Sequence, residues 1–445
     1  MSDHIRAEFG RSGVNGILYH RGDTGAPLQR WRTALREAWA QGWPAVKVLA
    51  ADAIDLVADS RVLFVAAESL RSGGPKATVP GGIALERYCG TEVRSLCNAL
   101  GKAIGSGKYR PGSEMTIGVP KASGGRRPIV LMDGADRIVQ KAILLVLRPV
   151  FDPRFDPRSF AFRVGRSREQ AIAVARALAR GGRPVWLTHD LKDAFGNVPV
   201  GRLLDVFSKH LPGPRLRALL ERVLPPQSRA RSGLKQGGPL SPLALELYLN
   251  HVLDKPFRRT GHDVRLVRYA DDLLVACPDE RAAVEADGEL RKLLTPAGLQ
   301  LKDPFDVARR DIRHEQAEWL GFRFRLDGER FRIEFGPSVF EKLDARFRLA
   351  HAKSRPAERT VAILTQWAAQ FGPCGRWEDR AAAIQGALDR ARACGFEESL
   401  PIREMESAWE RARDRWRSTI RSVHKSPAYL EGGSVPLPSP LSVVR

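Results

Sequence analysis

Alternating apolar and polar positions divide the chain into a series of predicted helices and hairpins. Apolar residues recur at helical spacing in several stretches, namely 28–39, 92–104, 136–144, 167–178, 243–253 and much of 338–422. Short apolar runs joined by tight turns predict β-hairpins over 116–131 and 264–277, and a further β-rich run covers 184–190. Helices and hairpins therefore alternate through the first three quarters of the chain, and helices alone follow.

The hairpin over 264–277 carries two adjacent carboxylates, Asp271 and Asp272, at its tip. Ionised carboxylates held among Val and Leu are costly unless a cation offsets their repulsion and desolvation. A metal ion is the expected cation. An ordinary solvated turn is the alternative, because Asp favours turns through its own backbone hydrogen bonds. A further acid, Asp190, ends the run over 184–190, where a strand could deliver it to the same edge of a sheet.

Basic residues gather at two other places that suit a phosphate. The hairpin over 116–131 places Lys121, Arg126 and Arg127 near its tip, where they could contact a polyphosphate. An exposed basic hairpin without a ligand is the alternative. Arg163 and Arg166 lie just ahead of a helix whose start is marked by a capping-box pattern, and a helix N-terminus favours phosphate.

Composition narrows the class of partner. The chain has 445 residues, enough for two to four lobes, and a formal net charge of +21 that is spread along its length. Nucleic acid is the first candidate. A membrane surface is the competitor, but no apolar stretch approaches the ~18 to 20 residues of a spanning helix, and we expect neither a signal peptide nor a membrane partner. Five scattered cysteines favour a reducing cytoplasm over structural zinc.

Seven sequence blocks resemble, in order, those of bacterial reverse transcriptases, most closely the enzymes encoded by group II introns. The resemblance covers about residues 108–325. The blocks are Val119–Pro128, Asp136–Gln140, Ser159–Arg163 with Gly165–Ser167, Asp190 with Phe195, Gln236–Pro242, Tyr269–Asp272 and Trp319–Phe322. Tyr-Ala-Asp-Asp alone would arise often by chance, whereas seven blocks in the correct order would not.

The resemblance implies an α+β right-hand polymerase with fingers, an antiparallel palm and a helical thumb. We expect the following parts: an N-terminal helical extension (1–75), fingers (76–185), palm (186–330), thumb (331–425) and a flexible tail (426–445). The basic helices after 338 fit a thumb that grips a template-primer duplex. No Cys/His-rich endonuclease block and no ribonuclease H pattern is present in the sequence.

The resemblance also assigns roles to individual residues. It implies that three acids catalyse the reaction and bind two Mg²⁺ ions: Asp190, Asp271 and Asp272. Nucleotide binding falls to Lys121, Arg127, Phe195, Gln236 and Gly237. Template and primer binding falls to Arg163, Arg166, Trp319, Leu320 and Gly321. Phe195 would lie beneath the incoming sugar, although an ordinary core phenylalanine is the commoner fate of such a residue.

The expected function is RNA-directed DNA synthesis on an RNA template from a DNA or RNA primer with deoxynucleoside triphosphates (dNTPs). We expect the protein to bind a cognate structured RNA and to function in a mobile element or a phage-defence (antiviral) system. An RNA-binding maturase or scaffold, and a template-independent DNA polymerase in defence, are the alternatives. Phe305 stands where relatives have a lysine, and Lys302 lies three residues earlier, so no general acid is assigned. The sequence leaves the oligomeric state open.

Overall fold

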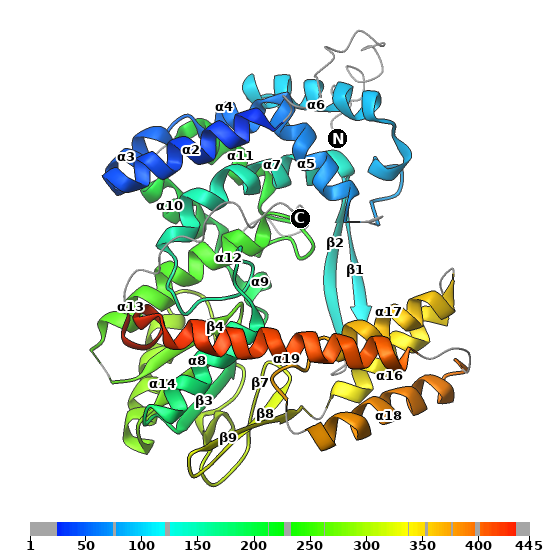
Figure 1. Ribbon diagram of the computed structural model, residues 1–445. Coiled ribbons are helices and arrows are strands. Elements are labelled where there is room, and N and C mark those ends of the chain that lie inside the picture. Colours follow the sequence, from blue (N-terminus) through cyan, green and yellow to red (C-terminus); the bar gives the residue numbers. More distant parts are fainter. Residues whose placement is uncertain are drawn as a thin grey trace.

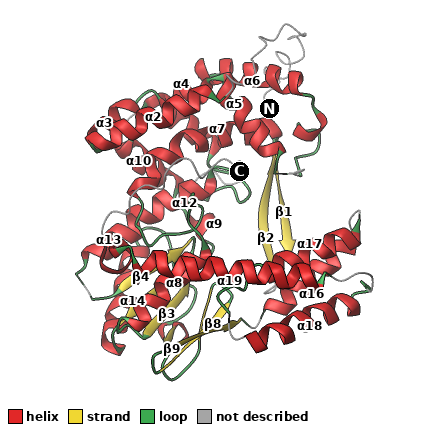
Figure 2. Cartoon of the chain, in the orientation of Figure 1, coloured by secondary structure: helices red, strands yellow, loops and turns green. Residues whose placement is uncertain are grey.

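The computed structural model describes most of the chain, and Figure 1 shows its course. The described residues are 25–73, 77–120, 125–211, 213–226, 233–261, 263–336, 338–351, 355–374, 377–396 and 401–432. Figure 2 shows that helices predominate and that the strands form separate groups. Among the described residues, no helix is both long and apolar enough to cross a membrane.

An N-terminal helical layer precedes the first hairpin. Its helices are α2 (Ala26–Gln41), α3 (Trp43–Leu49), α4 (Ala53–Ala58), α5 (Ser60–Arg71), the short 3₁₀ turn η1 (Leu85–Arg87) and α6 (Gly90–Gly105). They pack with α7 (Gly134–Phe151), which ends in the 3₁₀ turn η2 (Asp152–Arg154). Between them the antiparallel strands β1 (Glu114–Pro120) and β2 (Arg126–Met132) reach away as a long ribbon (Figure 1).

The centre of the molecule is a four-stranded antiparallel sheet in the order β4-β5-β3-β6. Its strands are β3 (Val185–Asp190), β4 (Arg265–Tyr269), β5 (Asp272–Cys277) and β6 (Arg309–Asp311). Around it lie α8 (Arg168–Arg180), α9 (Ala194–Asn197), α10 (Val200–His210), α11 (Pro214–Val223), α12 (Ser241–Leu249), the π-helical turn η3 (Asn250–Asp254), α13 (Lys255–Arg259), α14 (Glu280–Leu294) and α15 (Phe305–Ala308).

The sheet separates two hydrophobic cores because successive side chains of a strand point to opposite faces. On β3, Leu187 joins the core shared with the N-terminal helices, whereas Trp186 joins the core that continues into the C-terminal helices. On β5, Val275 and Leu274 divide in the same way. Both faces are buried, which explains why these strands read as nearly continuous apolar runs.

The second core contains a three-stranded sheet and the C-terminal helices. The sheet is formed by β7 (Ala317–Trp319), β8 (Phe322–Asp327) and β9 (Arg330–Phe335). The helices are α16 (Val339–His351), α17 (Pro356–Ala368), α18 (Trp377–Ala393), α19 (Ile402–His424) and the π-helical turn η4 (Ala428–Gly432). In Figure 1, α19 crosses the molecule from the other C-terminal helices to the central sheet.

The α+β right-hand fold class is confirmed, with an antiparallel central sheet and a helical C-terminal region. The flexible tail predicted over 426–445 is wrong at its start. Residues Ala428–Gly432 form a helical turn because Tyr429, 6% exposed, packs with its ring stacked on Phe160 at 5.8 Å between centroids. Residues beyond 432 lie outside the described part of the chain. The other domain boundaries stay predictions.

Candidate active site

The three predicted acids meet at one edge of the central sheet. In the antiparallel register of β3 and β5, Asp190 lies directly opposite Asp272. Asp271 occupies the turn between β4 and β5, and its carbonyl accepts a hydrogen bond from the Leu191 N–H at 3.1 Å. The turn is tight because Ala270 adopts a left-handed conformation with φ of 59°. Strand pairing thus places Asp190 beside residues that follow it by eighty positions.

These carboxyl groups affect each other electrostatically. Burial, together with the negative charges of Asp271 and Asp190, raises the pKa of Asp272 to about 7. Burial also raises the pKa of Asp271, whereas a hydrogen bond from its own backbone N–H and the positive charge of Arg127 lower it. The Lys302 Nζ lies 3.8 Å from the Asp190 Oδ2, and the Lys302 N–H donates to the Asp190 carbonyl at 2.8 Å. The site therefore concentrates negative charge, with Lys302 as a neighbouring cation.

Arg268 supports the acid-bearing turn from inside the protein. Its guanidinium is 1% exposed and lies between Glu246 and Asp254, with the shortest nitrogen-to-oxygen distances 2.8 and 2.6 Å. It also donates to the Ala270 carbonyl at 3.0 Å, and the Ser159 hydroxyl donates to Glu246 at 2.7 Å. The left-handed residue of the turn is therefore fixed by a buried and fully paired ion cluster.

The β1–β2 hairpin and the glycine-containing loop are connected to each other. The Val130 N–H donates to the Gln236 carbonyl at 2.8 Å, and Lys235 forms a buried ion pair with Glu114 at 3.0 Å. Gly237 has φ of 102°, and a Cβ there would lie 3.3 Å from the Val130 carbonyl oxygen. This close approach requires glycine. Exposed Arg127 lies on β2, whereas Lys121 lies outside the described residues.

Phe195 lies on the short helix α9, which follows Asp190 and its loop. Its ring is half-buried and contacts Phe162 edge to face, with the centroids 6.4 Å apart. Phe162 is 43% exposed and has φ of 59°. Hydrogen bonds link this helix to the glycine-containing loop, because the Leu234 N–H donates to the Phe195 carbonyl at 2.7 Å and the Gln236 side-chain amide donates to Asp193 at 3.3 Å.

The two arginines ahead of α8 have different surroundings. Arg163 is 8% exposed and donates to the Asp152 carboxylate and to the carbonyls of 152, 156 and 159, so it holds its own loop together. Arg166 hydrogen-bonds to the Tyr429 hydroxyl and lies over its ring. The capping box of α8 is confirmed. Contact of either arginine with a template stays a prediction.

The predicted primer-supporting segment is the turn of the β7–β8 hairpin. Trp319 is 4% exposed, and Leu320 and Gly321 both have positive φ, 50° and 82°. Leu320 and Tyr269 pack against the same hydrophobic core. The segment is therefore rigidly built and belongs to the same packed unit as the acid-bearing turn.

The acid edge suits a metal ion that is completed by substrate rather than a closed protein cage. Within the described ranges, no group of three or more His, Cys, Asp or Glu side chains lies close enough together to hold a metal ion by itself. Mg²⁺ commonly binds through one or two carboxylates together with waters and substrate phosphates. The opposed Asp190 and Asp272, with Asp271 adjacent, supply the required hard oxygen donors.

Sequence reasoning missed several residues that shape this site: Phe162, Asp193, Arg268, Glu246 and Asp254. A signal was present for two of them. Glu246 is a lone charge within an apolar helix, and Arg268 directly follows the apolar pair Leu266 and Val267. Charged residues in such positions are rarely buried without a partner, so the two could have been paired in advance.

Comparisons with known proteins agree with this geometry. Residues 119–324 match the family model described as reverse transcriptase (RNA-dependent DNA polymerase). Among curated proteins, the group II intron-encoded protein LtrA of Lactococcus lactis subsp. cremoris is 26% identical over 35% of this chain and 27% of its own. Protein YkfC of Escherichia coli is 30% identical over 33% of this chain and 41% of its own. An uncharacterized 91 kDa protein in the cob intron of Schizosaccharomyces pombe is 30% identical over 33% of this chain and 19% of its own. The chain thus matches less than half the length of each of these relatives.

Two solved structures are similar at low scores. A partial Cas6-RT-Cas1–Cas2 complex has 19% identity and a TM-score of 0.33, over 54% of this chain and 42% of that chain. Telomerase from Candida albicans, in complex with a fragment of telomeric RNA, has 11% identity and a TM-score of 0.38, over 74% of this chain and 67% of that chain. Scores of this size carry no argument about function. Residues 119–324 are therefore similar to reverse transcriptases, and the relatives of this segment include group II intron-encoded proteins.

Proposed function

We propose that the chain is an RNA-directed DNA polymerase that adds dNTPs to the 3′ end of a DNA or RNA primer. The observation that carries this proposal is the meeting of Asp190, Asp271 and Asp272 at one sheet edge, with Asp190 and Asp272 in register. Their mutual repulsion, expressed in the raised pKa of Asp272, is relieved when cations bind. Phosphoryl transfer needs such a concentration of cations around the reacting oxygens.

Asp190 and Asp271 are the proposed ligands of two Mg²⁺ ions, with Asp272 beside them. When bound, such ions supply activation of the primer 3′-hydroxyl and stabilisation of the pyrophosphate leaving group. Lys302 adds a positive charge next to Asp190, and Arg268 keeps the turn that bears Asp271 in place. The protein thus contributes a rigid set of oxygen donors and a local balance of charge.

The residues around the acids are proposed to hold the substrates. Lys121 and Arg127 would bind the triphosphate, and Phe195 would lie under the sugar, with Gln236 and Gly237 against the nascent base pair. The effect of Arg127 on the pKa of Asp271 supports its orientation toward the acids. Template and primer contacts are proposed for a further set: Arg163, Arg166, Trp319, Leu320 and Gly321.

Fingers, palm and thumb are proposed to span 76–185, 186–330 and 331–425. The net charge of +21 suits a nucleic-acid partner, for which we propose an RNA template and a cognate structured RNA. A bacterial mobile element or a phage-defence system is the proposed setting, in the cytoplasm, by analogy with the intron-encoded relatives.

Primer extension on an RNA template tests the proposal. Asp271→Asn should abolish extension while leaving the fold and RNA binding in place, because it changes the charge of one partly exposed side chain. Asp205→Asn is the matched control, since Asp205 is 72% exposed on α10 and pairs only with Arg217 in the described residues. If Asp271→Asn extends primers at the rate of the unaltered chain, the polymerase proposal is wrong and an RNA-binding scaffold is favoured.

A further inference from the structure

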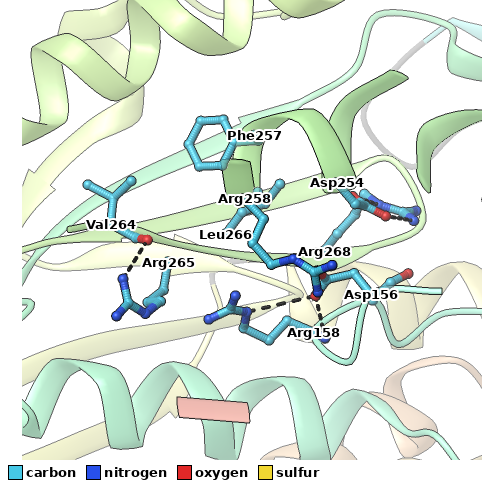
Figure 3. A pocket seen from close by; sticks show the side chains of 10 residues that line it. Asp156, Arg158, Asp254, Phe257, Arg258, Val264, Arg265, Leu266 and Arg268 are labelled. Carbon is cyan, nitrogen blue, oxygen red and sulfur yellow. Dashed lines mark hydrogen bonds and ion pairs between the residues drawn. The ribbon is translucent and has the colours of Figure 1, made fainter. Parts of the chain in front are cut away.

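A second charged site lies at the other end of β4, remote from the three acids. There a cavity of about 120 Å³ is lined by the segment before Ser159, by α13 and by the start of β4 (Figure 3). Arg265 begins β4 and lies six residues before Asp271, which is ~20 Å at ~3.3 Å per residue, whereas Arg268, which also lines the cavity, lies between it and the acids. A ligand bound here would not touch the reacting groups.

Arg158 forms the buried wall of the cavity. Its side chain is 6% exposed, and its Nε and Nη1 atoms have no hydrogen-bond acceptor among the described residues. The nearest carboxylate oxygen, Asp156 Oδ1, is 3.8 Å from Nε, beyond hydrogen-bonding distance. A buried guanidinium with unmade hydrogen bonds is costly, and an acceptor from outside the chain would remove that cost.

Two further arginines line the same cavity. Arg258 donates to Asp156 at 3.1 Å, and Arg265 donates to the Leu430 and Val264 carbonyls, each at 3.1 Å. In Figure 3 the side chains of Arg158 and Arg258 both reach toward Asp156, the carboxylate they share.

The carboxylates in the wall do not balance these charges. Asp156 also accepts the Arg158 backbone N–H, and both oxygens of Asp254 are engaged by Arg268. Among the described residues that line the cavity, three guanidinium groups therefore share Asp156, since Asp254 is engaged by Arg268. Outside the lining, Arg265 also pairs with Asp263 at 3.4 Å. Consistent with this excess, burial lowers the pKa of Arg158, and despite Asp156 the charges of Arg265, Arg258 and Arg183 lower it further.

We propose that this cavity binds a phosphate group. A phosphate presents several acceptor oxygens to the unsatisfied donors of Arg158, and arginine binds it bidentately. The volume far exceeds the ~10 to 15 Å³ that one water molecule needs. Phe257 and Leu266 form an apolar wall that limits solvent and strengthens the charge interaction. The phosphate comes either from solution, as free phosphate or a nucleotide, or from the backbone of RNA.

Titration with inorganic phosphate at constant ionic strength tests the site in the full chain. Calorimetry should detect one binding event, and Arg158→Gln should weaken the affinity at least tenfold. Arg258→Gln, at a side chain 42% exposed and therefore less essential for folding, should weaken it as well. Arg281→Gln removes the same charge from an 89% exposed position on α14 and should leave the affinity unchanged. Loss of phosphate binding at the two cavity variants alone supports the proposal.

A second experiment, on RNA binding, identifies the source of the phosphate. If RNA supplies it, a short single-stranded RNA should displace inorganic phosphate, and Arg158→Gln should reduce the salt slope of RNA binding by about one. If free phosphate or a nucleotide supplies it, the RNA slope should stay the same. Equal phosphate affinity in the unaltered chain, Arg158→Gln and Arg258→Gln would overturn the site. Asp271→Asn should still bind phosphate in the cavity, so a failure of the polymerase proposal would be recognised separately.

Discussion

The two ends of strand β4 carry opposite surpluses of charge. At its C-terminal end, Asp271 and Asp272 lie beside Asp190, and the Lys302 Nζ lies 3.8 Å from the Asp190 Oδ2. At its N-terminal end, Arg265, Arg158 and Arg258 line a cavity whose lining carboxylates are Asp156 and Asp254, and Asp254 is engaged by Arg268. Between the two ends lies Arg268, whose charge is fully paired by Glu246 and Asp254.

This difference distinguishes charges that stabilise the fold from charges that favour binding of a ligand with the opposite charge. A buried ion cluster that serves folding alone satisfies its own hydrogen bonds, as Arg268 does. Clusters that leave an excess of one sign are costly in the free protein and become favourable when the opposite charge binds. The acid end therefore suits cations and the arginine end suits an anion.

Removing one acid should produce the largest effect. Asp190→Asn should slow primer extension more than ~10⁴-fold, equivalent to over ~5 kcal/mol of barrier, because the proposed Mg²⁺ site loses a ligand. Single-turnover extension measures it, with circular dichroism to verify the fold. An extension rate within tenfold of that of the unaltered chain would contradict a role for the three acids in DNA synthesis.

Ionic strength should have the next largest effect. If the basic surface neutralises about six or more phosphates, the affinity for a template-primer duplex should fall ~10³-fold or more between 50 and 200 mM salt. Fluorescence anisotropy across that range measures the slope. A nearly flat dependence would mean that the net charge of +21 serves an acidic protein or a lipid instead.

The paired arginine should matter most for stability. Arg268→Met leaves Glu246 and Asp254 buried without their cation and should lower the free energy of unfolding by about 3 to 5 kcal/mol. Denaturant unfolding measures it. Because Arg268 also donates to the Ala270 carbonyl, the residual folded protein should extend primers more slowly at saturating substrate. A loss below 1 kcal/mol would contradict its structural role.

Phe195→Val tests whether the sugar lies over α9. The ring should exclude a 2′-hydroxyl through collision and lost hydrogen bonds, a few kcal/mol in total. The smaller side chain should therefore admit ribonucleotides by a factor of ~10² or more while deoxynucleotide incorporation continues. Single-nucleotide kinetics give the ratio of the two efficiencies. An unchanged ratio in a folded, active variant would return Phe195 to the role of an ordinary core residue.

The smallest effect is expected at the unsatisfied arginine. Without phosphate, Arg158→Met should change the free energy of unfolding by less than ~1 kcal/mol, because the residue makes few of its possible hydrogen bonds and the methionine retains much of its volume. The same denaturant experiment applies. A loss as large as that of Arg268→Met would show that Arg158 is a structural charge.

Local pattern was sufficient for some of the elements and for the position of the three acids at the ends of strands. The hairpin at 264–277, the strand ending at Asp190 and the cap at Ser167 each depend on neighbours in sequence, and each is present. Partners distant in sequence were not predictable in this way. Arg163 pairs with Asp152 rather than only facing a helix N-terminus, and Tyr429 is buried by residues nearly 270 positions earlier. Their partners are fixed by the tertiary fold.

The last described turn of the chain has a mechanical consequence. Helix α19 has 23 residues, or ~35 Å at 1.5 Å per residue, and it packs against α17 at one part and α8 at another. Beyond its end, Tyr429 stacks on Phe160 and bonds with Arg166, while the Leu430 carbonyl accepts from Arg265. Because these contacts hold the C-terminal end of α19, a rotation of the helix that keeps them intact takes place about that end. If the C-terminal helices swing outward while these contacts persist, their pivot lies beside the central sheet, and the far tips of α16 and α18 travel furthest.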